Sequence, residues 1–89
     1  MKYTDVLHRL QDRPFRPFRI HLSEGSIVAV DDPGMIIVGK SSMVVPTSFT
    51  RDEEGLRLAK HWRTIAMNHI VQFTELDEPM NGSKRKKKS

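Results

Sequence analysis

The sequence predicts a mainly β protein in which an N-terminal helix precedes a five-stranded small antiparallel barrel. Apolar residues near the N-terminus have helical spacing, whereas the short segments that follow are apolar or alternate polar with apolar residues. Turn-forming residues separate these segments at close intervals, as in small all-β domains. At 89 residues the chain has the length of one small domain.

The helix is expected over residues 5–12. Apolar residues recur at helical spacing from Tyr3 to Leu10, and Thr4 is a candidate N-cap. Pro14 ends the helix, because a proline disfavours helical geometry in the residue before it. Pro14 and Pro17 then hold the connector to the first strand in an extended conformation.

Strands are expected where short apolar segments lie between turns. The candidate strands cover residues 19–22, 26–30, 35–38, 43–45, 62–66 and 70–76. Gly25 tolerates the positive φ of a tight turn, and Pro33 with Gly34 forms a second turn. Pro46 stops its strand or places it at a sheet edge, because proline has no N–H for a central ladder.

Residues 47–61 interrupt the series of strands. Thr50 and Glu53 have the spacing of a capping box, which predicts a short helix. Gly55 weakens that helix, so a mobile loop with one or two helical turns is an equal alternative. The segment is longer than the about 2–5 residues of a hairpin connection, and long loops more often carry function.

Charge divides the chain into a domain, residues 1–78, and a disordered basic tail, residues 79–89. Residues 1–80 carry ten Lys and Arg against eleven Asp and Glu, which argues against a large basic face on the domain. The net charge of +4 comes from the tail cations Lys84, Arg85, Lys86, Lys87 and Lys88. These cations either contact nucleic-acid phosphates or only keep the chain in solution.

One segment of the chain has a recognisable pattern. Residues 14–25 read Pro-Phe-x-Pro-Phe-x-Ile-x-Leu-Ser-x-Gly, and His69-Ile70 follows near the end of the domain. With these motifs the chain resembles a family of small uncharacterised bacterial proteins over roughly residues 3–76. That family has no agreed biochemical role, so the resemblance implies an architecture and no particular activity.

The order of the elements also resembles an Sm-like or SH3-like barrel. In bacterial Sm-type RNA chaperones a helix precedes the first strand, and the final turn carries a lysine and a histidine before an apolar strand. Here Asn68 replaces the lysine, and His69 precedes the apolar Ile70. The resemblance implies that Asn68 and His69 contact RNA. The interpretation we favour for His69 is that it caps its own turn through a backbone hydrogen bond.

Arginines and phenylalanines alternate before the first strand. Arg16 and Arg19, beside Phe15 and Phe18, are typical of a base-stacking platform with flanking phosphate contacts, and both arginines are candidate nucleic-acid ligands. However, a chain this small needs its few aromatic residues in the core. We therefore expect the phenylalanines to pack the helix onto the barrel while the arginines stay in water.

Several kinds of chemistry are not expected. The chain has no Cys and its four histidines lack metal-ligand spacing, so neither a disulfide nor a metal site is predicted. Asp31 and Asp32 stand beside the Pro-Gly turn and are expected to be turn formers. Without a nucleotide-binding or nucleophile motif, we expect no enzyme, no cofactor and no small-molecule substrate. No apolar segment approaches the about 20 residues of a membrane span, which indicates a soluble cytoplasmic protein that binds no membrane.

We expect a non-enzymatic nucleic-acid-associated protein, linked to RNA or the ribosome, whose tail contacts phosphates. The alternative is a protein-interaction or self-assembling module with no nucleic-acid role. In that alternative an edge strand, Trp62 or residues 47–61 would bind a protein partner or a second copy. Trp62 is the candidate anchor because large aromatic residues dominate interface hot spots, although the interpretation we favour is that it closes one end of the barrel.

Overall fold

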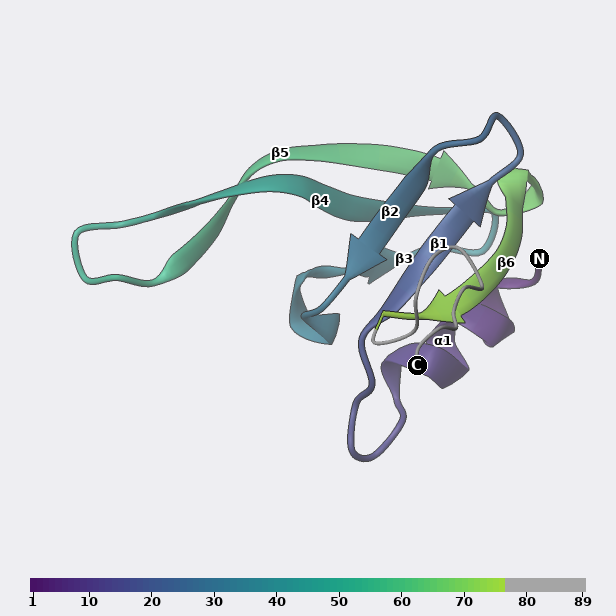
Figure 1. Ribbon diagram of the computed structural model, residues 1–89, viewed down its shortest axis with the longest axis horizontal. Coiled ribbons are helices and arrows are strands. Elements are labelled where there is room, and N and C mark those ends of the chain that lie inside the picture. Colours follow the sequence, from purple (N-terminus) through teal and green to yellow (C-terminus); the bar gives the residue numbers. More distant parts are fainter. Residues whose placement is uncertain (77–89) are drawn as a thin grey trace, which may run out of the picture.

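The computed structural model describes residues 1–76. Within these residues it contains one helix and six strands, which form two antiparallel sheets of three strands each (Figure 1). The helix is α1 (Tyr3–Leu10), and the strands are β1 (Phe18–Leu22), β2 (Ile27–Val30), β3 (Ile37–Val38), β4 (Ser42–Arg51), β5 (Arg57–Ala66) and β6 (Ile70–Glu75). One sheet has the strand order β2-β1-β6 and the other β3-β4-β5. A mainly β protein with an N-terminal helix is therefore confirmed.

The closed five-stranded barrel is not confirmed, because the two sheets stay separate in the described part of the chain. Between β2 and β3 lies the 3-10 turn η1 (Pro33–Met35), in which Asp32 Oδ1 accepts a hydrogen bond from the Gly34 N–H (3.0 Å). Pro33 has no N–H to donate to a neighbouring strand, so it cannot continue the ladder of β2. The chain therefore leaves the first sheet after β2 and joins the second sheet at β3. The 3-10 turn η2 (Met67–His69) makes the same change of sheet between β5 and β6.

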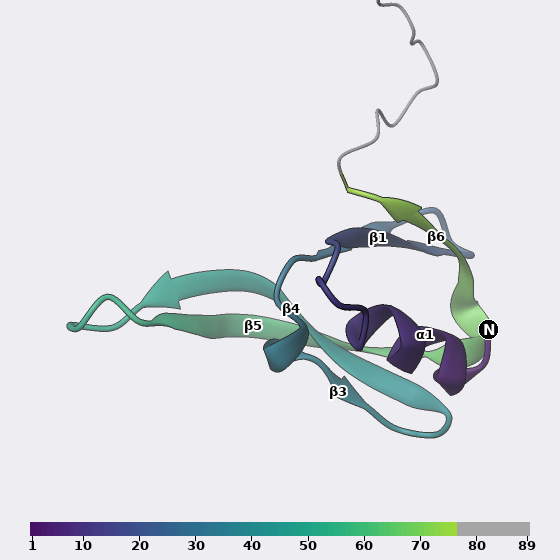
Figure 2. The same cartoon turned by 90° about the horizontal axis from the view of Figure 1, so that it is seen from below.

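Helix α1 begins two residues earlier than the sequence predicts. Lys2 and not Thr4 is the N-cap, and the Asp5 carboxylate accepts a hydrogen bond from the Lys2 backbone N–H (3.1 Å). The carboxylate thereby partners one of the donors at the start of the helix. Helix α1 lies between the two sheets (Figure 2), and its Val6 is fully buried. No helix within residues 1–76 is long and apolar enough to cross a membrane.

Helix α1 and both sheets contribute to one core. Its buried residues are Val6, Phe18, Ile20, Leu22, Val28, Val30, Met43, Val45, Ile65, Met67 and Ile70. Phe18 lies edge-on to Phe15 and to Phe73, with ring centroids 6.2 and 5.2 Å apart. Phe15 of the connector and Phe18, the first residue of β1, therefore pack the connector onto the core, as predicted, and Phe18 is too deeply buried to stack on a base.

The helix or loop predicted for residues 47–61 is wrong, because this segment completes the β4–β5 hairpin. Strand β5 begins at Arg57 and continues through Trp62, where the sequence predicts its start. Thr50 lies opposite Leu58 in the strand ladder, so the capping-box spacing starts no helix here. Cross-strand pairing wins because a short helix interrupted by glycine has little intrinsic stability.

Side chain and backbone together form the turn of this hairpin. Asp52 Oδ1 accepts hydrogen bonds from the N–H groups of Glu54 and Leu56, each 2.9 Å long. Gly55 has a φ of +84°, in the left-handed region that other residues avoid. The aspartate and the glycine therefore specify a turn at the place where the sequence pattern indicates a helix.

Strand β4 is the central strand of its sheet, so the prediction of an edge strand is wrong for β4 as a whole. However, β3 pairs only with Met43 and Val44. Pro46 lies beyond that contact and pairs with Trp62 on the β5 side, so its missing N–H interrupts no ladder to β3. The register shifts between Pro46 and Phe49, and here the two strands twist about each other (Figure 1).

The distal half of the β4–β5 hairpin projects beyond the two layers (Figures 1 and 2). We call this segment, residues 48–61, the arm. The radius of gyration of the Cα atoms is 14.4 Å, whereas a compact chain of 76 to 89 residues has about 11–12 Å. The difference reflects the arm, which makes the molecule 42 Å long in its longest dimension.

Candidate interaction surface

The solvent-facing side of the β3-β4-β5 sheet carries large apolar side chains. Along β5, the alternate residues Leu58, Lys60, Trp62 and Thr64 are all exposed. Trp62 is 64% exposed, Leu58 is 46% exposed, and Ile37 on β3 is 68% exposed. We call this side the outer face and define it by Ile37, Val44, Leu58, Lys60, Trp62 and Thr64. Large exposed hydrophobic residues gathered on one side of a small sheet are typical of a binding surface.

The strand register brings the apolar side chains of the outer face together. Ile37 pairs with Val44, which in turn pairs with Thr64. Trp62 pairs with Pro46, so it stands diagonally across from Val44, within reach of a large side chain. The row Ile37–Val44–Thr64 therefore adjoins Trp62.

Trp62 does not close a barrel, so the interpretation that the sequence favours for it is wrong. Side chains along a strand alternate between its two sides. Ile65 of β5 is buried in the core, and Trp62, three residues away, faces solvent. A role for Trp62 in binding a partner stays a prediction.

Opposite charges lie at the two ends of β4. The turn at its distal end contains Asp52, Glu53 and Glu54, all exposed. The turn at its proximal end, between β3 and β4, contains the exposed Lys40. Acidic residues therefore gather in the distal turn, next to the exposed Arg51 that ends β4, and Lys40 lies in the proximal turn.

Arg57 holds the arm against the body of the molecule. Its Nη1 and Nη2 lie 3.3 and 3.4 Å from the two carboxylate oxygens of Asp31, which follows β2. Its guanidinium carbon lies 3.5 Å from the centroid of the Phe49 ring. At the base of the arm, Ser48 Oγ and His61 Nδ1 are 2.8 Å apart. These directional contacts orient the arm relative to both sheets.

The predicted RNA ligands Asn68 and His69 belong to η2, at one end of β6. Nδ1 of His69 lies 3.2 Å from Ser23 Oγ, and the His69 carbonyl accepts a hydrogen bond from the Ser23 N–H (2.8 Å). His69 thus joins η2 to the turn between β1 and β2. This contact is structural, but it is made to another turn and is not the capping of its own turn that the sequence favours. Asn68 is exposed beside it.

Arg16 and Arg19, the other predicted RNA ligands, lie near the opposite end of β6. Arg19 donates hydrogen bonds to the carbonyls of Glu75 (2.8 Å) and Leu76 (2.9 Å), and Arg16 Nε is 3.9 Å from a Glu75 carboxylate oxygen. Strand β6 separates these arginines from His69 by about 17–20 Å. The predicted ligands therefore do not form one site. The tail cations Lys84, Arg85, Lys86, Lys87 and Lys88 lie outside the described residues.

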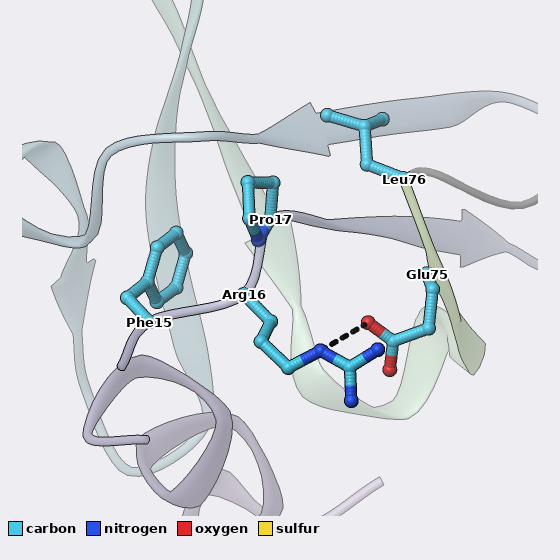
Figure 3. Close-up of a pocket in the computed structure, with 5 residues that line it drawn as sticks. All are labelled: Phe15, Arg16, Pro17, Glu75 and Leu76. Atoms are coloured by element: carbon cyan, nitrogen blue, oxygen red, sulfur yellow. Dashed lines mark ion pairs between the residues drawn. The ribbon is translucent and has the colours of Figure 1, made fainter. Parts of the chain in front are cut away.

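A shallow pocket of 350 Å³ lies beside Glu75, with Phe15, Arg16, Pro17 and Leu76 around it (Figure 3). Glu75 accepts a hydrogen bond from Arg9 Nη1 of α1 (2.8 Å). This bond, with the charges of Arg9 and Arg16, lowers the pKa of Glu75. Glu75 thus joins α1 and the connector to β6 through ion pairs with Arg9 and Arg16, although its Oε2 is buried without a hydrogen-bond partner.

A second polar cluster joins the two sheets. Arg63 of β5 donates hydrogen bonds to Glu24 (2.7 Å) and to Ser26 Oγ (3.2 Å), both in the first sheet's β1–β2 turn. Ser26 Oγ also donates to Glu24. The hydrogen bonds from Ser26 and Arg63 lower the pKa of Glu24. Like the Glu75 pair, this cluster stabilises the fold.

Residues 1–76 contain no group of three His, Cys, Asp or Glu side chains that could hold a metal ion. Comparison of the chain with protein-family models, with curated proteins and with solved structures found no match.

Sequence reasoning missed Ile37, Leu58 and Lys40 as parts of a surface. Apolar and polar residues do not alternate between Leu58 and Ile65, so the sequence carries no period-two signal for a strand with one solvent-facing side.

Proposed function

We propose that this protein is a non-enzymatic protein-interaction module that binds its partner through the outer face. The observation that carries the proposal is Trp62, a large aromatic side chain 64% exposed on a sheet rather than on a loop. Tryptophan is among the residues that most often dominate the binding energy of an interface. Because Arg57 holds the arm, little conformational entropy is lost when the face is covered.

The charges of the described residues favour a protein partner over a nucleic acid. Most arginines of this part are engaged within the domain: Arg9, Arg16, Arg57 and Arg63 with carboxylates, and Arg19 and Arg51 with carbonyls. The tip of the arm is acidic and would repel phosphates if the hairpin entered a groove. Aromatic residues with few free charges are instead typical of the centre of a protein interface.

We further propose that the fold is an opened version of an Sm-like or SH3-like barrel. Three features support this proposal: sequential strands are neighbours in each sheet, β6 returns to pair with β1, and a 3-10 turn precedes β6. Membership of the small bacterial family with the Pro-Phe-x-Pro-Phe motif stays a proposal that rests on the motif alone.

Nucleic-acid association is the second candidate function, and the five tail cations Lys84–Lys88 favour it. It is tested by fluorescence anisotropy with single-stranded RNA over a salt series, for the full chain and for a chain ending at Pro79. Binding that falls steeply with salt and disappears with the tail would assign RNA capture to the tail. RNA binding retained by the shorter chain would contradict the assignment of the outer face to proteins.

The interaction proposal is tested with the single tryptophan as probe. Full-length protein labelled with 5-fluorotryptophan gives one ¹⁹F resonance, recorded over a concentration series and in nuclease-treated extract of the cells that express the protein. We expect the resonance to shift or broaden in at least one series.

Unlabelled wild-type protein should reverse the change caused by extract, and the unlabelled Trp62→Ala variant should not. Val71→Ala, exposed on the other sheet, is the matched control and should compete fully. A sharp, unshifted resonance in both series would refute the proposal.

A further inference from the structure

We propose that the partner contributes an extended segment that pairs antiparallel with the free edge of β5 and carries an acidic residue two positions after a large apolar one. The inference rests on the proposed function, because it requires the outer face to bind protein, and it names the kind of partner. Its basis is the juxtaposition of an unpaired strand edge, the exposed Trp62 and the cation Lys60 along one strand.

Strand β5 is the longest edge strand among the described residues. It has ten residues and pairs only with β4, whereas the other edge strands, β2, β3 and β6, have four, two and six residues. A short edge strand offers few backbone groups to another chain. A further strand therefore gains most hydrogen bonds at β5.

The register with β4 determines which backbone groups of β5 are unpaired. In an antiparallel ladder, residues that exchange hydrogen bonds with the residue opposite alternate with residues that do not. The Met67 N–H donates to the Ser41 carbonyl (2.9 Å), so the bonded positions of β5 recur every second residue from there back to Arg63. The N–H and C=O groups of Thr64 and Trp62 therefore point away from β4, toward the free edge.

An added strand satisfies these groups and places its side chains beside those of β5. We choose the antiparallel direction because it is slightly more stable per residue than the parallel one. Residues opposite Trp62 and Thr64 then exchange both backbone hydrogen bonds with them, and their side chains lie on the same side of the sheet. A large apolar side chain opposite Trp62 therefore covers the indole on the outer face.

The first sheet leaves room for such a strand. A pocket of 190 Å³ lies beside this part of β5, lined by residues 63–66 together with Leu22, Glu24 and His69. Successive side chains of a strand point to opposite sides. One inward-pointing side chain of the added strand can therefore enter this pocket while its neighbours lie on the outer face.

Charge along β5 selects an acidic segment. The strand carries Arg57, Lys60 and Arg63 and no Asp or Glu. The two arginines form ion pairs with carboxylates outside β5, whereas Lys60 has no ion-pair partner among the described residues. Lys60 precedes Trp62 by two residues, so an antiparallel segment brings the residue two positions after its apolar one close to Lys60. The flexible side chain of Lys60 reaches a carboxylate there despite the shift of register at this point.

Selection from a library of short random peptides displayed on phage tests the inference. The full chain is the target, and the Trp62→Ala chain, which has the same basic tail, removes peptides that bind the tail. We expect enriched peptides to carry a large apolar residue followed two positions later by Asp or Glu. Enriched peptides without this pattern, or a selection that enriches no sequence, would overturn the inference.

Fluorescence anisotropy of one selected peptide tests the charge contact. Lys60→Glu should weaken binding by about threefold to tenfold, and a peptide with lysine in place of its acidic residue should restore it. Arg13→Glu reverses a charge at an exposed position outside β5 and should leave the affinity unchanged. Circular dichroism verifies that each variant is folded. An affinity that Lys60→Glu does not change, or that the exchanged peptide does not restore, overturns the inference.

Methylation of backbone nitrogens in the same peptide tests strand pairing, because it removes the hydrogen-bond donor. At the residues that face Trp62 and Thr64 it should weaken binding by about tenfold or more. The residues between them are the matched control, since their N–H groups point to the other edge of the added strand, and methylation there should change the affinity little. Equal losses at the two sets of positions would show that the segment does not bind as a strand.

The outcomes for this inference and for the proposed function are distinguishable. If no peptide has the expected pattern, but the ¹⁹F resonance changes in extract and is restored by wild-type competitor, the acidic strand is refuted and the interaction module is retained. If neither is observed, both are refuted. Displacement of the selected peptide by single-stranded RNA would assign this surface to nucleic acid and overturn both proposals.

Discussion

The guanidinium group of Arg57 lies over the ring of Phe49, with its central carbon 3.5 Å from the ring centroid. The same group pairs with both carboxylate oxygens of Asp31 on the body of the molecule. A two-stranded hairpin without such support is marginally stable in water. This one residue therefore couples the arm both to its own opposite strand and to the turn that follows β2.

Replacing Arg57 with lysine is expected to loosen the arm while the core stays intact. Lysine keeps the charge but loses the planar stacking and the two-pronged contact, each of which contributes about 0.5–1 kcal/mol at an exposed site. Amide hydrogen exchange of residues 48–58 should accelerate by about threefold to tenfold, with little change in β1. Equal acceleration in β1 would show that the arm and the body unfold as one unit.

Replacing Val6 with alanine tests whether α1 is part of the core. Val6 is fully buried between the sheets, so removing two methyl groups and leaving a cavity should cost about 1.5–3 kcal/mol. Thermal unfolding should then shift down by about 8–15 °C for a domain of this size. His8→Ala, on the exposed side of the same helix, is the control and should change stability by less than about 0.5 kcal/mol. A Val6 variant as stable as wild type would mean that α1 does not pack as described.

The elements that the sequence predicts well are those in which local pattern and packing agree. The helical spacing around Val6 and the alternation of Ile20 and Leu22 indicate the correct faces, because the same residues form the core. Phe18 is buried for the reason that the sequence suggests, the scarcity of aromatic residues in a short chain. The N-cap differs because the Asp5 carboxylate partners the Lys2 N–H and extends the helix backward.

The arm and the candidate site escape sequence reasoning for a physical reason. Thr50 and Glu53 have a helical signature, but the turn contacts of Asp52 and the pairing of β4 with β5 are non-local and outweigh it. Trp62 is a large apolar residue, and hydrophobicity alone favours burial. Its exposure follows from the register, in which Ile65 faces the core and Trp62 the opposite side.

Acid is expected to weaken the link between α1 and β6. The pKa of Glu75 is lowered in the folded protein by Arg9 and Arg16, so its contribution to stability is fully present above the unfolded value of about 4.3. That contribution is lost as the pH falls through the lower folded value. The difference in melting temperature between wild type and Glu75→Gln should therefore shrink between pH 7 and pH 3. Glu24→Gln should show a smaller effect in the same direction, since its side chain is 56% exposed against 18% for Glu75. A difference independent of pH would contradict the role of the Glu75 charge.

Gly25 and Gly55 both have positive φ, +102° and +84°, and a Cβ at either position would meet nothing within 4 Å. Replacement by alanine therefore costs only backbone strain, about 1–2 kcal/mol at each site. The consequences should nevertheless differ. Gly25 closes the turn between β1 and β2, where opening disrupts the core, so Gly25→Ala should lower the melting temperature of the whole domain.

Gly55 closes the tip of the arm, which can open without exposing the core. In Gly55→Ala the tip can relieve the backbone strain by opening locally, so the domain loses at most the free energy that keeps the tip closed. The melting temperature should therefore change little. Hydrogen exchange at residues 51–57 should instead accelerate. Asparagine tolerates the left-handed conformation, so Gly25→Asn and Gly55→Asn should each have a smaller effect than the corresponding alanine. Equal losses of melting temperature in the two alanine variants would show that the tip folds cooperatively with the body.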